Sequence, residues 1–211
     1  MAIASTVISK SSDHWQRIYS GKSATDVSWY QPAAVRSLAF IQTASPDRSA
    51  PIIDVGGGAS TLVDGLLDAG YTDITVLDIA EAGLAAARER LGSAEKGVAW
   101  IVADVTAWTP PRRWHVWHDR AVFHFLVEPK QQDDYIAALT AATAPGSVIV
   151  LATFAPDGPT RCSGLPVQRY SATTLADRLG PHYRLTTTEQ ERHRAPSGAE
   201  QNFCWAVFRR L

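Results

Sequence analysis

The sequence is poor in cysteine, in charged residues of either sign and in long apolar runs. Cys162 and Cys204 are the only cysteines, which excludes a disulfide-rich scaffold and a four-thiolate zinc site. No run of eighteen apolar residues occurs, so we expect no helix that spans a membrane. The 20 basic and 21 acidic residues give a formal net charge of -1, and this balance offers no electrostatic basis for binding nucleic acid or a membrane surface.

What is present suits one domain with a sizeable core. The chain has 211 residues, of which 45% are hydrophobic and seven are tryptophan, a composition that also argues against disorder. The first twelve residues are polar and rich in serine and threonine. They lack the basic start and apolar centre of a secretory signal, so we expect a cytoplasmic protein with free thiols.

From residue 51 onward, short apolar runs alternate with amphipathic stretches, a pattern typical of an α/β fold with a mostly parallel sheet. The last two apolar runs have no helix between them, so they should pair antiparallel. We therefore predict a Rossmann-like, seven-stranded, mostly parallel sheet with an antiparallel terminal hairpin and helices on both faces. The predicted strands cover residues 51–55, 74–78, 99–103, 114–119, 147–154, 183–190 and 202–209.

The first fifty residues follow a different pattern. A short helix is expected at residues 14–19, then an aromatic segment at residues 28–32, then a helix at about residues 33–43. We expect two parts: an N-terminal helical lid segment (1–50) and the main domain (51–211).

A glycine-rich turn is the sharpest local motif. Asp54-Val-Gly-Gly-Gly-Ala-Ser60 lies between the first strand and the helix that follows it. Glycines at such a turn let a ligand approach the backbone closely, and the helix start offers free N–H groups. A merely tight turn between strand and helix would look the same, so this motif is weak evidence by itself.

Three carboxylates strengthen the interpretation. Asp54, Asp78 and Asp104 each lie at or near the end of a predicted strand, and parallel strands bring their carboxyl ends to one crevice. There the acids would repel one another unless a ligand satisfied them. A ligand with an amine, a ribose diol and an exocyclic amino group fits this set.

Two classes of ligand compete for this crevice. A dinucleotide site calls for G-x-G-x-x-G, but Thr61 stands where the third glycine would be. S-adenosylmethionine carries no phosphate and presents an ammonium, a ribose and an adenine to the three acids. The residues favour S-adenosylmethionine, and a short NAD(P)-dependent reductase stays as an alternative.

The chain from Pro51 to Leu211 resembles the class I S-adenosylmethionine-dependent methyltransferases. The resemblance is carried by D-V-G-G-G-A-S (54–60), V-L-D-I-A (76–80), A-D-V-T (103–106) and the terminal hairpin. It implies that S-adenosylmethionine is the cofactor, with its ammonium near Asp54, its ribose on Asp78 and its adenine at Asp104. The full set of cofactor-binding residues that we expect is Trp15, Tyr30, Asp54, Gly56, Gly57, Gly58, Ser60, Asp78, Ile79, Asp104 and Val105.

The fourth strand and the turn after it supply the catalytic candidates. Strand alternation places His115 and His118 on opposite faces, which argues against a metal pair, so no metal site is expected. Asp119 lies at the carboxyl end of the strand, where chemistry occurs in such sheets, and His124 follows in the turn. We name both as catalytic candidates; His124 is either a base or a satisfied histidine.

The same region points to a subgroup. W-H-D-R (117–120), then V-E-P and Tyr135, resembles the thiopurine and small-thiol methyltransferases, although His118 is a departure from their pattern. The S-W-Y-Q segment (28–31) instead resembles small protein-lysine methyltransferases. A long loop rich in proline and glycine follows the fifth strand and is a candidate acceptor site. The expected substrate-binding residues are Trp29, Arg120, Phe154 and Arg161.

The predicted function is methyl transfer from S-adenosylmethionine to a small-molecule nucleophile by direct in-line displacement. A thiol or other acidic heteroatom is favoured because it needs little help from a base. The main alternative is a protein-lysine N-methyltransferase, and a binding module that lost its activity is a third possibility. We expect a small-molecule substrate, no nucleic-acid or membrane partner, and a monomer or dimer.

Overall fold

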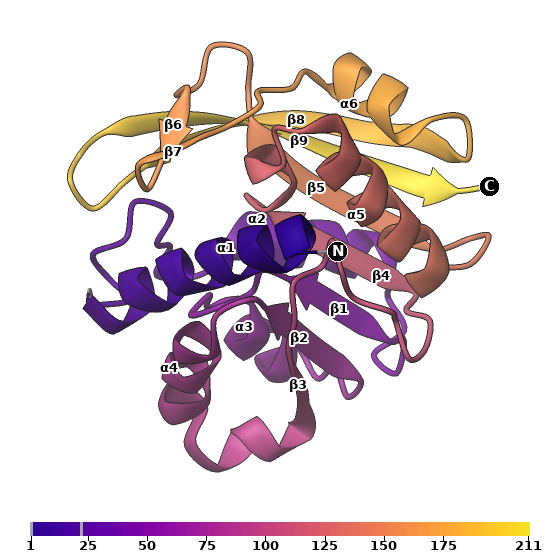
Figure 1. Cartoon of the computed structure of the whole chain (residues 1–211). Helices are drawn as coiled ribbons and strands as arrows, with labels where there is room; N and C mark the ends of the chain where they lie inside the picture. Colours follow the sequence, from indigo (N-terminus) through magenta and orange to yellow (C-terminus); the bar gives the residue numbers. More distant parts are fainter. Residues whose placement is uncertain (1, 22) are drawn as a thin grey trace.

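The computed structural model describes residues 2–21 and 23–211, with side chains from residue 11 onward. Its centre is a seven-stranded sheet in the order β3-β2-β1-β4-β5-β9-β8, beside a separate hairpin formed by β6 and β7 (Figure 1). The strands of the sheet are β1 (Ile52–Val55), β2 (Ile74–Asp78), β3 (Val98–Val102), β4 (Val116–Arg120), β5 (Val148–Phe154), β8 (Tyr183–Arg194) and β9 (Glu200–Arg210). The hairpin strands are β6 (Arg161–Cys162) and β7 (Leu165–Pro166).

The predicted fold class is confirmed. The strands β3, β2, β1, β4 and β5 pair in parallel, whereas β9 runs antiparallel to both β5 and β8. The terminal hairpin is longer than predicted, because β8 extends to Arg194 and β9 begins at Glu200. Most side chains of β8 are exposed and polar, as suits the edge strand of a sheet, so hydropathy alone did not reveal its second half.

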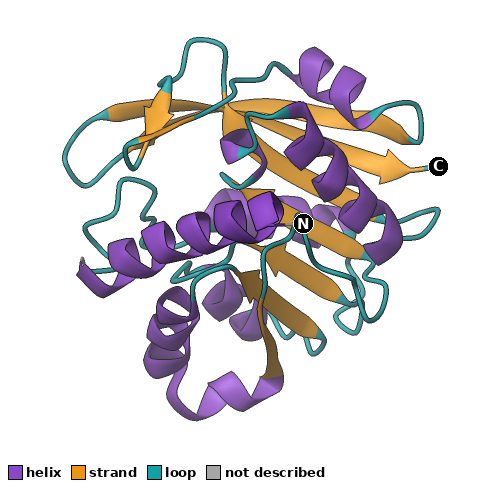
Figure 2. Ribbon diagram, in the orientation of Figure 1, coloured by secondary structure: helices purple, strands orange, loops and turns teal. Residues whose placement is uncertain are grey.

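Helices cover both faces of the sheet (Figure 2). The helices are α1 (Ala2–Gly21), α2 (Val35–Ala44), α3 (Leu62–Asp68), α4 (Glu81–Leu91), α5 (Pro129–Ala142) and α6 (Ala172–Leu179), with short 3-10 turns η1 (Gly92–Gly97) and η2 (Phe123–Phe125). In the described part of the chain, none of these helices is both long and apolar enough to cross a membrane.

The helix α5 starts at Pro129, where Glu128 and Gln131 form a reciprocal capping box and proline occupies the first turn, both of which favour a helix start. The helix α1 begins earlier than the sequence predicted, at Ala2 rather than residue 14. Serine, threonine, valine and isoleucine make up most of its first half, and these residues have lower intrinsic helix propensity than alanine or leucine.

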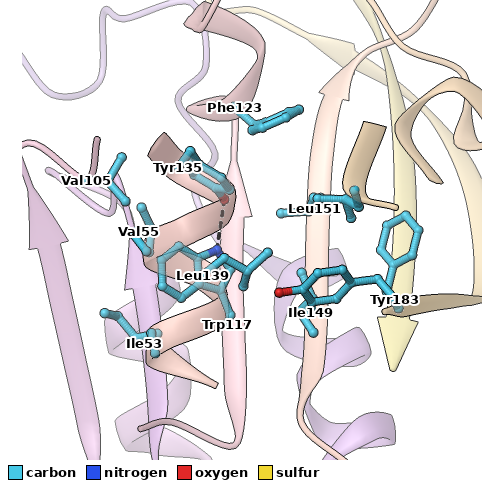
Figure 3. Packing of buried hydrophobic residues seen from close by; sticks show 14 of the residues in the cluster. Ile53, Val55, Val105, Trp117, Phe123, Tyr135, Leu139, Ile149, Leu151 and Tyr183 are labelled. Atoms are coloured by element: carbon cyan, nitrogen blue, oxygen red, sulfur yellow. Dashed lines mark hydrogen bonds between the residues drawn. The ribbon is translucent and has the colours of Figure 1, made fainter. Parts of the chain in front are cut away.

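The core has separate parts on the two faces. One cluster packs α5 and α6 against the sheet, and the other packs α2, α3 and α4 against the opposite face. In the first cluster, the Trp117 indole N–H donates to the Tyr135 hydroxyl at 2.8 Å (Figure 3). The Trp117 side chain is fully buried, because it projects toward α5 rather than toward the end of the sheet.

Candidate functional site

The glycine-rich turn is shaped by close contacts within the protein. Gly56 and Gly58 have positive φ angles of +71° and +44°, which side-chain-bearing residues rarely adopt. A β-carbon on Gly56 would overlap a methyl group of Val122, and one on Gly58 would lie 2.9 Å from Cζ of Tyr19. On Gly57 a β-carbon would lie 2.7 Å from Oδ2 of Asp54. Each of the three glycines therefore lets a different neighbour approach the turn.

A cavity of about 830 Å³ opens beside this turn, at the carboxyl ends of the parallel strands. Its size lies within the range of small-molecule sites. Of the residues predicted from the sequence, it is lined by Trp15, Trp29, Gly56, Asp78, Ile79, Asp104 and Val105. The three strands β1, β2 and β3 bring these cofactor candidates to one place, as parallel strand ends should.

A second, smaller cavity of about 40 Å³ lies behind the turn. Predicted residues that line this one are Tyr30, Asp54, Gly57, Ser60 and Arg120. Gly56 and Trp29 line both cavities, so the two cavities adjoin at the glycine-rich turn. The large cavity holds the groups expected for a nucleoside, and the small one holds one acid, Asp54, with His118 and Arg120.

Asp78 is the buried carboxylate of the larger cavity. Its Oδ1 accepts the backbone N–H of Ala80 at 2.8 Å. Burial is the main cause that raises the pKa of Asp78 to about 7. The charge of Asp54 acts in the same direction, and backbone hydrogen bonds to Asp78 oppose the rise. A carboxylate held in this state is stabilised by any ligand that donates hydrogen bonds to it, so Asp78 suits a pair of ribose hydroxyls.

Asp54 is paired with a residue that we did not assign to the site. Its Oδ1 lies 2.7 Å from Nδ1 of His118, and both side chains are almost fully buried. The strands β1 and β4 place the two residues directly side by side in the parallel register. The His118 insertion that departs from the thiopurine pattern is therefore the partner of the first acid in the glycine motif.

The structure does not bring Asp119 to either cavity. Its carboxylate accepts the backbone N–H groups of Val122 and Phe123 at 2.8 and 3.0 Å, and the Tyr135 hydroxyl at 2.6 Å. Burial raises the pKa of Asp119 to about 6, while these hydrogen bonds oppose the rise. With these donors in place, Asp119 holds the turn after β4, in which Ala121 has a positive φ of 73°. This geometry supports a positioning role rather than proton transfer.

His124 is likewise turned away from the cavity. It is fully buried, and its Nδ1 accepts the backbone N–H of Phe154 at 3.2 Å. Burial lowers the pKa of His124 to about 3, with the Arg120 charge as the second cause. Phe154 is also buried, with its ring 4.6 Å from the imidazole. Both residues belong to the core here, because η2 turns His124 inward and leaves Phe125 at the cavity wall.

The two predicted arginines lie in different environments. Arg120 is buried and donates from Nη1 to the Trp29 carbonyl at 3.1 Å, with Nε 4.0 Å from Glu191. Its Nε and Nη2 have no hydrogen-bond partner among the described residues. Arg161 is exposed and donates to the Gly164 carbonyl inside the β6–β7 hairpin, so it does not reach either cavity.

Three residues that line the cavity, Tyr19, Phe125 and Cys162, were not among the site residues predicted from the sequence. The predicted Trp15 packs edge-to-face on Trp29 and on Phe125, with centroid distances of 5.7 and 4.9 Å, and Tyr19 packs on Trp29 at 6.2 Å. Cys162 lines the same cavity, and burial raises the pKa of its thiol. The available signal was the run of aromatics on α1; Phe125 gave no signal apart from its neighbour His124.

Part of the chain matches proteins of known family. Residues 52–146 match the family model described as a methyltransferase domain. A mouse (Mus musculus) eEF1A lysine and N-terminal methyltransferase is 27% identical over 96 residues, which is 46% of this chain and 14% of that protein. The chain thus spans about one seventh of the length of the curated relative that it matches.

Solved structures match over most of the chain. A S-adenosylmethionine-dependent methyltransferase from Anabaena variabilis has a TM-score of 0.73 at 14% identity, covering 95% of each chain. The Burkholderia thailandensis 1,6-didemethyltoxoflavin-N1-methyltransferase, solved with S-adenosylhomocysteine, has a TM-score of 0.69 at 17% identity and covers 100% of this chain and 88% of that one. The glycopeptide N-methyltransferase MtfA in complex with S-adenosylhomocysteine has a TM-score of 0.67 at 13% identity, covering 86% and 92%.

Together these findings show that residues 52–146 resemble a methyltransferase domain and that the chain has the fold of solved S-adenosylmethionine-dependent methyltransferases. That neighbours of this fold bind S-adenosylhomocysteine supports S-adenosylmethionine as the cofactor. The residues present fit that molecule, because Asp78 is a buried carboxylate in need of donors and Asp104 and Val105 line the same cavity.

Proposed function

We propose that this chain, with its methyltransferase domain at residues 52–146, transfers a methyl group from S-adenosylmethionine to a small molecule. The acceptor atom is a thiol or another acidic heteroatom, as in the thiopurine and small-thiol methyltransferases that the W-H-D-R region resembles. One observation carries this proposal: the aromatic rings of Trp15, Trp29 and Phe125 line the cavity, and no histidine lines it among the described residues. We also propose that the protein is cytoplasmic, because Cys162 and Cys204 are free thiols and thiols stay reduced in that compartment.

The cofactor half of the cavity is assigned to residues from three strand ends. When bound, S-adenosylmethionine supplies an electrophilic methyl group. Asp78 accepts the ribose hydroxyls, Asp104 and Val105 contact the adenine, and Asp54 attracts the ammonium from behind the glycine-rich turn. The turn itself brings the backbone close to the cofactor, because its glycines carry no side chain into the space.

The acceptor half is built by the N-terminal segment and the turn after β4. Trp15, Trp29 and Phe125 pack edge-to-face around it, and Ala121 and Cys162 complete the wall. Such a wall excludes water and holds a flat or apolar acceptor in one orientation. Alignment of this kind can contribute roughly 7–11 kcal/mol toward the barrier of a two-molecule reaction.

Deprotonation of the acceptor must come without a dedicated base. The two sequence candidates do not serve: Asp119 is fully engaged with hydrogen-bond donors, and His124 is buried in the core. An acceptor with a pKa near or below that of a thiol, about 8.5, is partly ionised near neutral pH. The Arg120 guanidinium lines the small cavity, but its charge reaches the Cys162 thiol in the wall of the large one, so it would favour an anion there.

The test is a panel of thiols, phenols and amines, with release of S-adenosylhomocysteine as the readout. We expect turnover with thiols or other acidic heteroatoms, and none with the Asp78→Ala variant. Reaction with amines alone would contradict the proposed acceptor class, and failure to bind S-adenosylhomocysteine would contradict the proposed cofactor.

A second candidate function is protein-lysine methylation. The 27% match to a eEF1A lysine and N-terminal methyltransferase favours it, and Glu128 and Asp134 add acidic groups to the cavity wall. A radiolabel assay with folded protein substrates tests it: label on lysine side chains with no turnover of small acceptors would replace the first proposal by the second.

A further inference from the structure

We infer that His118 is a positioning residue, which orients the Asp54 carboxylate for the charged amino-acid end of the cofactor. The inference rests on the proposed function, because it concerns the same cofactor. It assigns a role to a residue that neither the glycine motif nor the acids of the strand ends include.

The geometry makes His118 the partner of Asp54. The distance between Nδ1 of His118 and Oδ1 of Asp54 is 2.7 Å, and no other hydrogen-bond donor to this carboxylate is found among the described residues. The two side chains are only 3% and 4% exposed, so water does not replace this contact. The parallel pairing of β1 with β4 puts them opposite one another, which means that the sheet itself holds the pair together.

The other carboxylate oxygen remains available. Oδ2 of Asp54 faces Gly57, where a β-carbon would lie only 2.7 Å from it. Asp54, His118 and Gly57 all line the small cavity of about 40 Å³. A water needs about 10–15 Å³ on such a measure, so the space admits a few waters or one small polar group. His118 thus occupies one oxygen and leaves the other for a cation.

The surrounding charges make this support necessary. Asp78 on β2 and Asp119 on β4 are both buried acids in electrostatic contact with the pair, and Tyr19 on α1 also faces Asp54. Arg120 lines the same cavity as the positive member of the set, and on β9 the neutral Trp205 ring packs 6.2 Å from the imidazole. Neighbouring acids repel one another, and the hydrogen bond from His118 holds the Asp54 carboxylate in place against that repulsion.

Loss of the His118 donor should therefore weaken recognition of the ammonium and leave the nucleoside unaffected. A hydrogen bond to a charged group corresponds to about 10- to 100-fold in affinity. A purely structural role would instead weaken all ligands equally.

The experiment compares two ligands by calorimetry at pH 6.0 and 7.5. S-adenosylhomocysteine carries the amino-acid end, and 5′-methylthioadenosine has the same nucleoside and thioether without it. Because Asp78 contacts the part that both share, the ratio of their two Kd values isolates the amino-acid end. His118→Phe keeps a ring against Trp205 and removes the donor, whereas His118→Asn places an amide N–H near the position of Nδ1.

In His118→Phe the preference for S-adenosylhomocysteine should fall by about 10- to 100-fold relative to the wild type at both pH values. His118→Asn should retain most of the preference. An unchanged ratio in His118→Phe would overturn the inference while leaving the proposed function intact. If the wild-type protein bound neither ligand, both proposals would fall.

A measurement on the wild-type protein covers the case in which His118→Phe does not fold. Nitrogen NMR of the histidine rings reports which ring nitrogen carries the proton. We expect Nδ1 of His118 to be the nitrogen that carries the proton donated to Asp54, with and without S-adenosylhomocysteine. A bare Nδ1 in either state would overturn the inference.

Discussion

The Tyr135 hydroxyl donates a hydrogen bond to Oδ2 of Asp119 at 2.6 Å, behind the turn whose front faces the large cavity. The same carboxylate accepts two backbone N–H groups of that turn. Helix α5 is therefore tied to the end of β4 through one buried acid. This arrangement makes Asp119 part of the scaffold that places Ala121 and Val122. It explains why Asp119, near the end of β4, does not line the large cavity.

The first prediction concerns this contact. Tyr135→Phe should lower the free energy of unfolding by about 2 kcal/mol, because it removes a hydrogen bond to a buried acid and leaves the Trp117 N–H without its acceptor. Urea denaturation measures the change. Tyr183→Phe is the matched control, since its hydroxyl meets only the Thr140 hydroxyl at 2.8 Å, and it should cost less. An equal loss in both variants would contradict the role given to Asp119.

The second prediction concerns stability and pH. The pKa of Asp78 is raised to about 7 and that of Asp119 to about 6, both by burial, above the unfolded value of about 3.9. The native state therefore binds more protons than the unfolded state between these values, so these groups stabilise the fold at low pH. Their contribution should be lost as the pH rises from about 4 to 7.

Urea denaturation of the ligand-free protein across this range measures the effect. Asp78→Asn removes one of the two groups, so the slope of the unfolding free energy against pH should become shallower between pH 5 and 7. The same slope in the variant and the wild type would show that Asp78 does not titrate in this window.

The third prediction concerns cofactor affinity. Ribose hydroxyls donate to the ionised form of Asp78, and its pKa of about 7 makes that form the minor one below neutral pH. The Kd for S-adenosylhomocysteine should rise as the pH falls from 8 to 6, approaching tenfold per pH unit at the acidic end. In Asp78→Asn the affinity should be weaker and nearly independent of pH over this range, for 5′-methylthioadenosine as well. A pH-independent wild-type Kd would be the contrary result.

The fourth prediction concerns the glycine-rich turn. Gly56→Ala introduces a methyl group that overlaps Val122, at a φ of +71°, whereas Gly70→Ala has a φ of +85° and no atom within 4 Å. Gly70→Ala should cost only the backbone strain, about 1 kcal/mol. Gly56→Ala should cost more and lower the affinity for S-adenosylhomocysteine by at least tenfold. Thermal unfolding and calorimetry distinguish the two, and similar behaviour of both variants would refute the close approach.

The fifth prediction concerns the acceptor. Arg120→Gln should raise the KM of an acidic acceptor by about tenfold or more and leave the Kd of 5′-methylthioadenosine unchanged, because the guanidinium is assigned to the acceptor anion. Arg192→Gln serves as the control, since that arginine lies on the exposed edge strand in an ion pair with Glu200. Steady-state kinetics with the best acceptor of the panel provide the measurement, and an unchanged KM would remove Arg120 from the acceptor site.

Most of the architecture could be predicted from the sequence, because it depends on local patterns. Apolar runs of strand length, separated by amphipathic stretches, determine a parallel sheet, and the missing helix before residues 202–209 determines the antiparallel end. The glycines after β1 and the acid at the end of β2 follow from the same local logic, since strand ends meet at one edge of the sheet.

Only the tertiary structure decided which way individual side chains turn after β4. Asp119 and His124 lie at the expected end of the sheet, but backbone N–H groups, Tyr135 and the Phe154 amide engage them from the inside. Their partners come from residues 3 to 30 positions away in the chain, so no local pattern could reveal them. The pairing of Asp54 with His118 is longer in range still, at 64 positions, and exists because β1 and β4 are neighbours in the sheet. The sequence determined the sheet and its edge, whereas packing across that sheet decided which polar groups are occupied and which are open to a ligand.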